Sequence, residues 1–231
     1  MPSTLTTRPG RMSSRERVQA FFARVSSDRV PINYCANPGI DARLKAAFGL
    51  APTDHEGLLQ VLGVDFRGIH VPYTGPRLHP EMPGRNVCPQ FGIHTRHVEH
   101  GTGAYEDFCD FPLRDATEED IAAWPMPNPD HYDYSIVEPM CKTYDQYALY
   151  VGGAGLGDII NSSGMIRSDE QVMMDIITEN PAWQLYVDRR LDVTLEVARR
   201  ILETAKGRVD FLWMGEDLGT QHAPLISLDM Y

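Results

Sequence analysis

A cluster of polar side chains follows directly on the apolar run Val209–Met214, which has the pattern of a strand buried on both faces. Its members, within Gly215–His222, are Glu216, Asp217, Gln221 and His222. In a parallel α/β protein, residues just past the carboxyl end of a strand face the mouth of the active site. We therefore predict Asp217, Glu216 and His222 to be catalytic and Gln221 to bind substrate. The alternative is a turn or helix-capping cluster, because Asp and Gly are common in turns.

A glycine-rich segment, Gly152–Gly157, follows another short apolar run, Tyr147–Val151. Its spacing is not that of the G-x-G-x-x-G dinucleotide motif, and no first strand near the N-terminus supports a dinucleotide-binding fold. Because glycine lets a ligand approach the backbone closely, we predict Gly153, Gly155 and Asp158 to contribute to substrate binding. A tight loop between a strand and a helix explains the same glycines equally well.

Three further polar side chains lie along or just after the expected strand Asp65–Val71. Arg67 is able to hold a substrate carboxylate through two parallel hydrogen bonds. His70 and Tyr73 are able to donate a proton or a hydrogen bond, so all three are predicted to bind substrate. A partly buried polar face is the alternative.

His94, His97 and His100 resemble metal ligands at first sight. The segment has the pattern of a strand, and alternation sends His97 to the face opposite the other two. His94 and His100 would then be about 20 Å apart, too far to share an ion. We predict a solvated hairpin and no metal site here.

The helices that position these residues are indicated by capping boxes, in which the first cap residue and the residue three positions later bond each other's backbone N–H. Such pairs precede four apolar runs: Ser13 with Glu16, Thr53 with Glu56, Thr117 with Asp120, and Ser168 with Gln171. The longest helix is expected to start at Asn180 and Pro181 and to end at Gly207.

Four short apolar runs are the expected strands, namely Val30–Cys35, Asp65–Val71, Tyr147–Val151 and Val209–Met214. They alternate with helices, which predicts an α/β fold with a parallel sheet. The proline-rich stretch Pro72–Pro89 and the alternating stretch Gly92–Gly103 predict an excursion that contains a hairpin. Residues 1–12 are polar and are expected to be a disordered leader to a domain spanning residues 13–231.

The 231 residues carry a net charge of −11, and the sequence pI is about 5.1. An acidic surface repels phosphate backbones and anionic lipid, so we expect neither nucleic acid nor membrane as a partner. Small molecules and other proteins remain. With no apolar stretch long enough to span a membrane and no signal-peptide pattern, a cytoplasmic location is expected, with the four separated cysteines reduced.

Four segments resemble proteins of the uroporphyrinogen decarboxylase family. The first is the opening SSRERVQAFFARVSSDRVPI (residues 13–32). The others are GVDFRGIH with YTGP (63–76), FPLRDATEEDIAAWPMPNPDHYDY (111–134) and above all GEDLGTQHAPLISLDMY (215–231). These resemble the branch that includes corrinoid-dependent methyltransferases.

The resemblance implies a (β/α)8 barrel fold, the TIM barrel. It also implies an enzyme that moves a methyl group between a corrinoid and a small-molecule donor or acceptor. A corrinoid protein is then an expected partner, and zinc an expected cofactor held by a His-x-Cys pair and a later Cys. Those ligands would lie beyond Tyr231. Since a closed barrel takes about 250 residues, we expect an incomplete barrel that lacks its C-terminal strand–helix units.

Two other functions stay open on the same resemblance. Decarboxylation of the acetate side chains of uroporphyrinogen is the first, although the family's Arg-Gln-Ala-Gly-Arg motif is replaced here by Cys35-Ala36-Asn37-Pro38-Gly39. The aspartate context F-S-D-I of true decarboxylases is likewise replaced by IHVPY, so Arg67, Arg43 and Arg77 would have to grip the substrate carboxylates. The second is a non-catalytic barrel that only binds a corrinoid.

Overall fold

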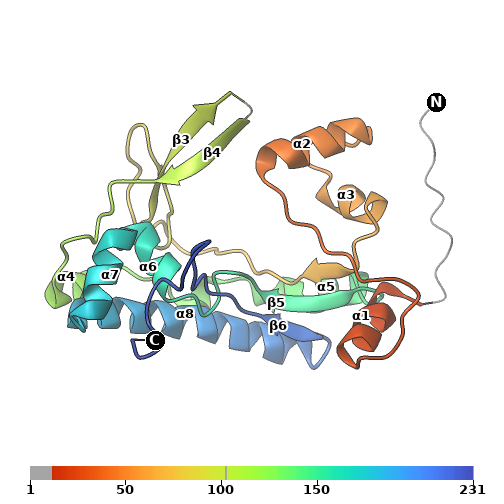
Figure 1. Ribbon diagram of the computed structural model, residues 1–231. Helices are drawn as coiled ribbons and strands as arrows, with labels where there is room; N and C mark the ends of the chain where they lie inside the picture. The colour runs from red at the N-terminus through yellow and green to blue at the C-terminus, as the bar shows by residue number, and fades with distance from the viewer. Residues whose placement is uncertain (1–11, 102, 231) are drawn as a thin grey trace. The chain divides into compact units, whose positions relative to one another are not determined.

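The computed structural model describes residues 12–101 and 103–230 of a mixed α/β protein (Figure 1). The helices are α1 (Ser14–Phe22), α2 (Pro38–Ala47), α3 (His55–Val61), α4 (Glu118–Ala123), α5 (Val137–Thr143), α6 (Ile160–Arg167), α7 (Asp169–Ile177) and α8 (Pro181–Ala205), with two short 3-10 helices, η1 (Pro129–His131) and η2 (Tyr134–Ile136). The strands are β1 (Phe66–Gly68), β2 (Asn86–Val87), β3 (His94–His100), β4 (Gly103–Phe108), β5 (Ala148–Gly152) and β6 (Phe211–Trp213). The leader expected at residues 1–12 falls almost wholly outside the described residues.

The chain divides into two compact units. Unit 1 comprises Met1–Ile69, Ser135–Val151 and Thr204–Leu212. Unit 2 comprises His70–Tyr134, Gly152–Glu203 and Trp213–Tyr231. Each unit is described by itself below. No helix of the described residues combines the length and apolarity needed to cross a membrane.

A parallel sheet has the strand order β1-β5-β6, which is also the order of these strands along the chain. Phe66 pairs with Ala148 and Gly68 pairs with Tyr150. The prediction of an α/β fold with a parallel sheet is confirmed. Within the described residues this sheet has three strands and does not close into a barrel.

The strand expected at Val30–Cys35 is not formed, so this prediction was wrong. Pro31 has no N–H, and the N–H of Ile32 donates to the carboxylate of Asp65 at 2.8 Å. One backbone hydrogen bond of the kind found between strands is formed, from the N–H of Asp65 to the carbonyl of Ile32 at 2.8 Å. The segment therefore runs extended beside β1 without joining the ladder.

The strand expected at Val209–Met214 exists as β6 but is shorter and less buried than predicted. Leu212 is 42% exposed and Met214 is 53% exposed. An apolar run is buried on both faces only when strands and helices flank it on all sides. Because β6 is an edge strand of the sheet, part of its apolar surface faces solvent.

The second sheet is the hairpin expected from the alternating stretch. Its order is β2-β3-β4, with antiparallel pairing of Thr95 to Phe108 and of His100 to Gly103. His97 Nδ1 lies 3.0 Å from a carboxylate oxygen of Glu106, and His94 Nδ1 lies 3.2 Å from one of Asp110. His94 and His97 thus contact neighbouring carboxylates. The hairpin is confirmed, and His97 and His100 are exposed as predicted, whereas His94 is buried.

Most of the expected helix starts are formed by the predicted caps. Ser13 with Glu16 and Thr117 with Asp120 form complete capping boxes. Ser168 accepts the N–H of Gln171, and Asn180 accepts the N–H of Ala182 at the start of α8. The cap expected at Thr53 was wrong by one residue, because the carboxylate of Asp54 accepts the N–H of Gly57 instead. A carboxylate reaches this donor without the steric demands of the branched threonine side chain.

A buried ion network organises unit 1 around Asp65, whose surface is 0% exposed. Its carboxylate accepts hydrogen bonds from Arg17 Nη1 at 2.5 Å and from Arg29 Nη1 and Nη2 at 2.5 and 2.8 Å. The Ser14 hydroxyl donates to it as well, at 2.7 Å. One carboxylate therefore ties α1 and the segment that follows it to the start of β1.

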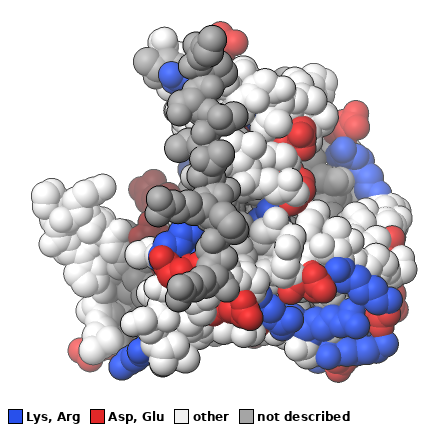
Figure 2. Space-filling view, turned by 90° about the vertical axis from the view of Figure 1, so that its right-hand side faces the viewer, with Lys and Arg blue, Asp and Glu red and all other residues white. Residues whose placement is uncertain are grey.

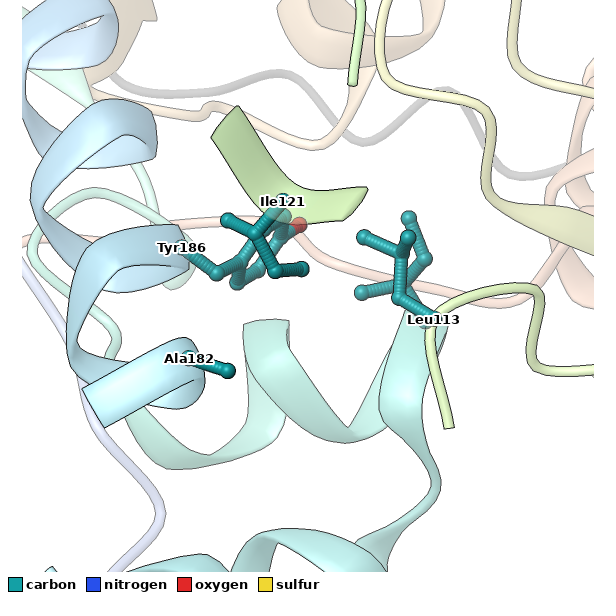
Figure 3. Packing of buried hydrophobic residues seen from close by; sticks show 5 residues of the cluster. Leu113, Ile121, Ala182 and Tyr186 are labelled. Atoms are coloured by element: carbon teal, nitrogen blue, oxygen red, sulfur yellow. The ribbon is translucent and has the colours of Figure 1, made fainter. Parts of the chain in front are cut away.

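The core of unit 2 is an apolar cluster, shown in Figure 3. Its buried members are Leu113, Ile121, Ile166, Ala182 and Tyr186. They come from α4, α6, α8 and the segment before α4, so this cluster joins parts of the chain that are far apart in sequence. Figure 3 shows Tyr186 and Ile121 pointing toward each other.

Candidate functional site

Two loops meet at the carboxyl ends of β5 and β6. The N–H of Gly153, after β5, donates to the carbonyl of Trp213 at 3.0 Å. The N–H of Gly215, after β6, donates to the carbonyl of Leu156 at 3.4 Å. The glycine-rich segment and the acidic segment picked out in the sequence therefore lie against each other, backbone to backbone.

The glycines of the first loop serve this contact between backbones. Gly152 has φ +99°, and a Cβ placed on it would lie 2.2 Å from the carbonyl oxygen of Trp213. Gly157 has φ +75°, and its Cβ would meet the side chain of Met214 at 2.5 Å. These two positions require glycine for backbone conformation and for close approach, which favours the tight-loop interpretation of the motif.

The predicted ligand-binding glycines of this loop have other surroundings. A Cβ on Gly153 would meet no atom within 4 Å, so its Cα faces open space. The carbonyl of Gly155 accepts a hydrogen bond from Arg190 Nη2 at 2.7 Å. Of Gly153 and Gly155, Gly153 is the one with open space beside its Cα, where a ligand could approach the backbone.

Glu216 caps the start of α6 from a distant part of the chain. Its Oε2 accepts the N–H of Ile159 at 2.6 Å, and its Oε1 accepts the N–H of Ile160 at 3.3 Å. The amide of Asn161 donates to Oε1 at 3.2 Å. The N-cap residue of α6 is Ile159, whose side chain has no acceptor. Glu216 thus satisfies helix donors that no local side chain satisfies.

Asp158 stands next to Glu216 and forms a carboxyl pair with it. Asp158 is 5% exposed, and its Oδ1 accepts the N–H of Ser162 at 3.1 Å. Burial, followed by the hydrogen bond and charge of Asp158, raises the pKa of Glu216, and the backbone N–H groups of Ile159 and Ile160 only partly oppose this. The pair therefore holds a proton at pH values where an ordinary glutamate is ionised.

Arg190 of α8 fixes the loop that carries Asp158. Its guanidinium donates to the carbonyls of Asp158 at 2.6 Å and of Gly155 at 2.7 Å. Burial lowers the pKa of Arg190, while Tyr186, Asp158 and Glu216 oppose that shift. Sequence reasoning missed Arg190, because nothing in a helical repeat marks one arginine as the support of a loop.

The remaining residues of the acidic segment lie on an exposed turn. Asp217, Gln221 and His222 are all exposed. Asp217 Oδ1 accepts the N–H of Gly219 at 3.4 Å, and the N–H of His222 donates to the hydroxyl of Thr220 at 3.2 Å. These bonds fit the turn interpretation, and they leave the Asp217 carboxylate and the His222 ring at the surface.

Arg67 is 3% exposed, and its donors are already used. Nε and Nη2 donate to the carboxylate of Glu56 at 2.8 and 2.9 Å, and Nη1 donates to the carbonyls of Val64 and Phe66. The guanidinium also lies 3.8 Å from the ring centroid of Tyr147. This geometry favours the alternative of a buried polar face over a clamp on substrate.

His70 and Tyr73 come after β1 in the chain and belong to unit 2. The residue His70 is exposed. Neighbouring atoms nevertheless partly desolvate its imidazole ring, which lowers its pKa. The Tyr73 hydroxyl donates to the carbonyl of Pro76 at 3.0 Å, and its ring packs edge-on against Tyr132 with centroids 5.2 Å apart. Burial beside Tyr73 raises the pKa of Tyr132 to about 12. Tyr73 is thus part of a small aromatic cluster.

Comparisons with protein families, with curated proteins and with solved structures find no match to this chain. The chemistry of the site therefore rests on its own residues.

Within the described residues, no group of three His, Cys, Asp or Glu side chains is placed to hold a metal ion. What the site does have is a proton-holding carboxyl pair, Asp158 with Glu216, next to an exposed rim that carries Asp217, Gln221 and His222. A carboxyl group with a raised pKa is suited to act as a general acid.

Proposed function

We propose that this protein is a (β/α)8 barrel of the uroporphyrinogen decarboxylase family, in its branch of corrinoid-dependent methyltransferases. The observation that carries the proposal is the resemblance of GEDLGTQHAPLISLDMY (215–231) to that branch. The strand order is consistent with a barrel, because β1, β5 and β6 are parallel and lie side by side in chain order, as successive strands of a barrel do.

The segment Val30–Cys35 gives further support. It runs beside β1 and is joined to it by the hydrogen bond from the N–H of Asp65 to the carbonyl of Ile32. In a barrel, the strand that precedes β1 in the chain occupies this position. A complete barrel needs eight parallel strands, and the described residues supply β1, β5 and β6 to it.

In this proposal the reaction moves a methyl group from a heteroatom of a small molecule to a corrinoid, which enters as the second substrate. The departing heteroatom then gains a proton. The Asp158–Glu216 pair would hold that proton at the carboxyl edge of the sheet, where barrel enzymes carry out their chemistry. The described residues do not fit a zinc ion, so no step of this proposal uses one.

The exposed rim would receive the small molecule. Asp217, Gln221 and His222 offer a carboxylate, an amide and an imidazole at the surface. We assign them the orientation of the polar groups of the substrate. Arg67 has no such role in the proposal, because its donors bind Glu56 and backbone carbonyls.

The test uses the purified full-length protein with cob(I)alamin and a panel of S-, N- and O-methyl compounds. Formation of methylcobalamin is followed by its visible absorbance. We expect Glu216→Gln to lower the rate roughly a hundredfold, because the amide oxygen still accepts helix N–H groups but the amide cannot give up a proton. Asp217→Ala should raise KM, and the matched control Glu99→Gln, an exposed residue of β3, should change neither rate nor KM.

Two results would contradict this function. Conversion of uroporphyrinogen to coproporphyrinogen, without methyl transfer from any donor, would indicate a decarboxylase. Binding of cobalamin without turnover of either substrate would indicate a barrel that only binds a corrinoid.

A further inference from the structure

An apolar groove of about 430 Å³ lies in unit 2, away from the paired carboxyl groups. One wall is α7, through Met173 and Ile177, which are one helical turn apart. The other wall is the segment 224–230, through Leu225, Ile226 and Met230. The groove is therefore lined by large aliphatic side chains on both sides.

Hydrogen bonds give the second wall a defined shape. The N–H of Leu225 donates to the carbonyl of Leu218 at 2.9 Å, and the N–H of Thr220 donates to the carbonyl of Ala223 at 2.8 Å. A turn closed in this way holds the aliphatic side chains that follow it opposite α7. The groove thus exists before any partner binds, which lowers the entropy cost of binding.

Much of the apolar surface in and around the groove is accessible to solvent. Ile177 is 63% exposed and Met230 is 42% exposed. Their chain neighbours add to it, because Met174 is 52% exposed and Leu228 is 88% exposed. Exposed apolar side chains at a groove are typical of a binding site for another protein. Methionine is common in such grooves because it adapts to different partners.

The charged side chains of the two segments that contain the walls are all acidic. Residues 168–180 and 214–230, which form both walls, contain no lysine or arginine. They contain the exposed carboxylates Glu170, Glu179 and Asp229, which form no ion pair within the described residues. The face of the molecule drawn in Figure 2 differs, because acidic and basic side chains lie next to each other there.

We propose that this groove binds a basic amphipathic helix of a partner protein. The apolar face of the helix would enter the groove with side chains spaced three and four positions apart, and its Lys and Arg side chains would meet the acidic rim. A second copy of the chain fits poorly, since each copy carries a net charge of −11 and the two would repel each other. The proposal does not depend on the methyl-transfer function.

The experiment titrates the full chain with a fluorescent 18-residue peptide of leucine and lysine, patterned as an amphipathic helix. Fluorescence anisotropy measures Kd. We expect Ile177→Ser and Met230→Ser each to weaken binding about tenfold, which corresponds to the loss of one buried aliphatic side chain. The matched control is Leu195→Ser on α8, which removes a side chain of similar exposure (44%) outside the groove and should leave Kd unchanged.

Charge is tested separately with a second peptide, in which glutamate replaces every lysine, and with the variant Glu170→Gln/Glu179→Gln. The glutamate peptide should bind at least tenfold more weakly, and the charge variant should lose affinity for the lysine peptide chiefly at low salt. Equal binding of both peptides would overturn the proposal, as would a Kd that Ile177→Ser and Met230→Ser leave unchanged. Dimerisation of the chain that Ile177→Ser abolishes, measured by light scattering, would also overturn it, because a second copy would then cover the groove.

Discussion

Unit 1 and unit 2 each place a carboxyl group beside a parallel strand, and the pKa values of the two groups are shifted in opposite directions. Asp65 lies just before β1, where burial opposes its ionisation but hydrogen bonds from Arg29, Ile32 and Ser14 outweigh burial and lower its pKa. Glu216 lies just after β6, where burial and the neighbouring Asp158 raise its pKa.

Asp65 is the more deeply buried of the two, yet its pKa is the lowered one, so the partners of a carboxyl group can outweigh the effect of burial. Two guanidinium groups hold Asp65 ionised, so it acts as a fixed structural anchor. Burial and the neighbouring carboxyl group of Asp158 raise the pKa of Glu216 against backbone N–H groups that lower it, so Glu216 loses its proton at a higher pH than an ordinary glutamate. Only the second arrangement is suited to acid chemistry.

The largest expected effect comes from Asp65→Asn. The amide leaves the charges of Arg17 and Arg29 without their shared partner inside unit 1, and removing one member of a buried ion pair is costly. We expect the free energy of unfolding, measured by urea denaturation, to fall by about 3 kcal/mol. The control is Asp107→Asn, which breaks the exposed pair with Arg96 and should cost less than about 1 kcal/mol. Equal losses for the two variants would refute the role of Asp65 as an anchor.

Gly152→Ala tests whether close backbone contact brings the carboxyl pair together. The added Cβ would lie 2.2 Å from the carbonyl oxygen of Trp213, at a backbone φ of +99° that L residues rarely adopt. A loss of at least about 2 kcal/mol in the free energy of unfolding is expected. Gly153→Ala is the matched control, because its Cβ enters open space and should cost under about 1 kcal/mol. If both variants were equally stable, the loop contact would not matter.

The smallest effects are expected at Glu216, where two substitutions separate the cap from the proton. Glu216→Ala removes the acceptor for the N–H groups of Ile159 and Ile160 and should cost about 1 kcal/mol, as for other N-caps. Glu216→Gln keeps an acceptor for these N–H groups and removes the ionisation. Its stability should therefore equal or exceed that of the natural protein at pH 8, again measured by urea denaturation.

The pH dependence of stability distinguishes the two carboxyl groups. Because the folded pKa of Glu216 is raised, its contribution is fully present below about pH 4.5, the ordinary value, and is lost as the pH rises through the folded pKa. The contribution of Asp65 has the opposite sign, present above about pH 3.8 and lost as the pH falls through its lowered folded pKa. Glu216→Gln should flatten the decline above pH 4.5 and leave the acid side unchanged; an unaltered decline would refute the raised pKa.

Features set by neighbours in sequence were predictable from the sequence. The capping boxes at Ser13 and Thr117 depend on residues three positions apart, and α8 follows from its own apolar repeat. The hairpin of β3 and β4 follows from alternation and from its glycines. In each case the deciding interactions lie within one turn or one hairpin of each other.

Features set by distant parts of the chain were not predictable. Val30–Cys35 has the composition of a strand, but the carboxylate of Asp65 takes the N–H of Ile32. Arg67 has a guanidinium group that could hold a substrate carboxylate, but this group already binds Glu56 and packs on the ring of Tyr147. One signal for the role of Glu216 was present, because α6 begins at an isoleucine that cannot cap it, so another segment has to supply an acceptor.

Because Glu216 caps α6, the order in which helices form during synthesis differs from their order along the chain. The acceptor lies 57 residues after Ile159, and all of α7 and α8 are made before it. Until that glutamate has left the ribosome, the first turn of α6 has exposed donors, while α8 with its own local cap can already form. The nascent chain should therefore gain its long helix first and complete the short one only after β6 has emerged.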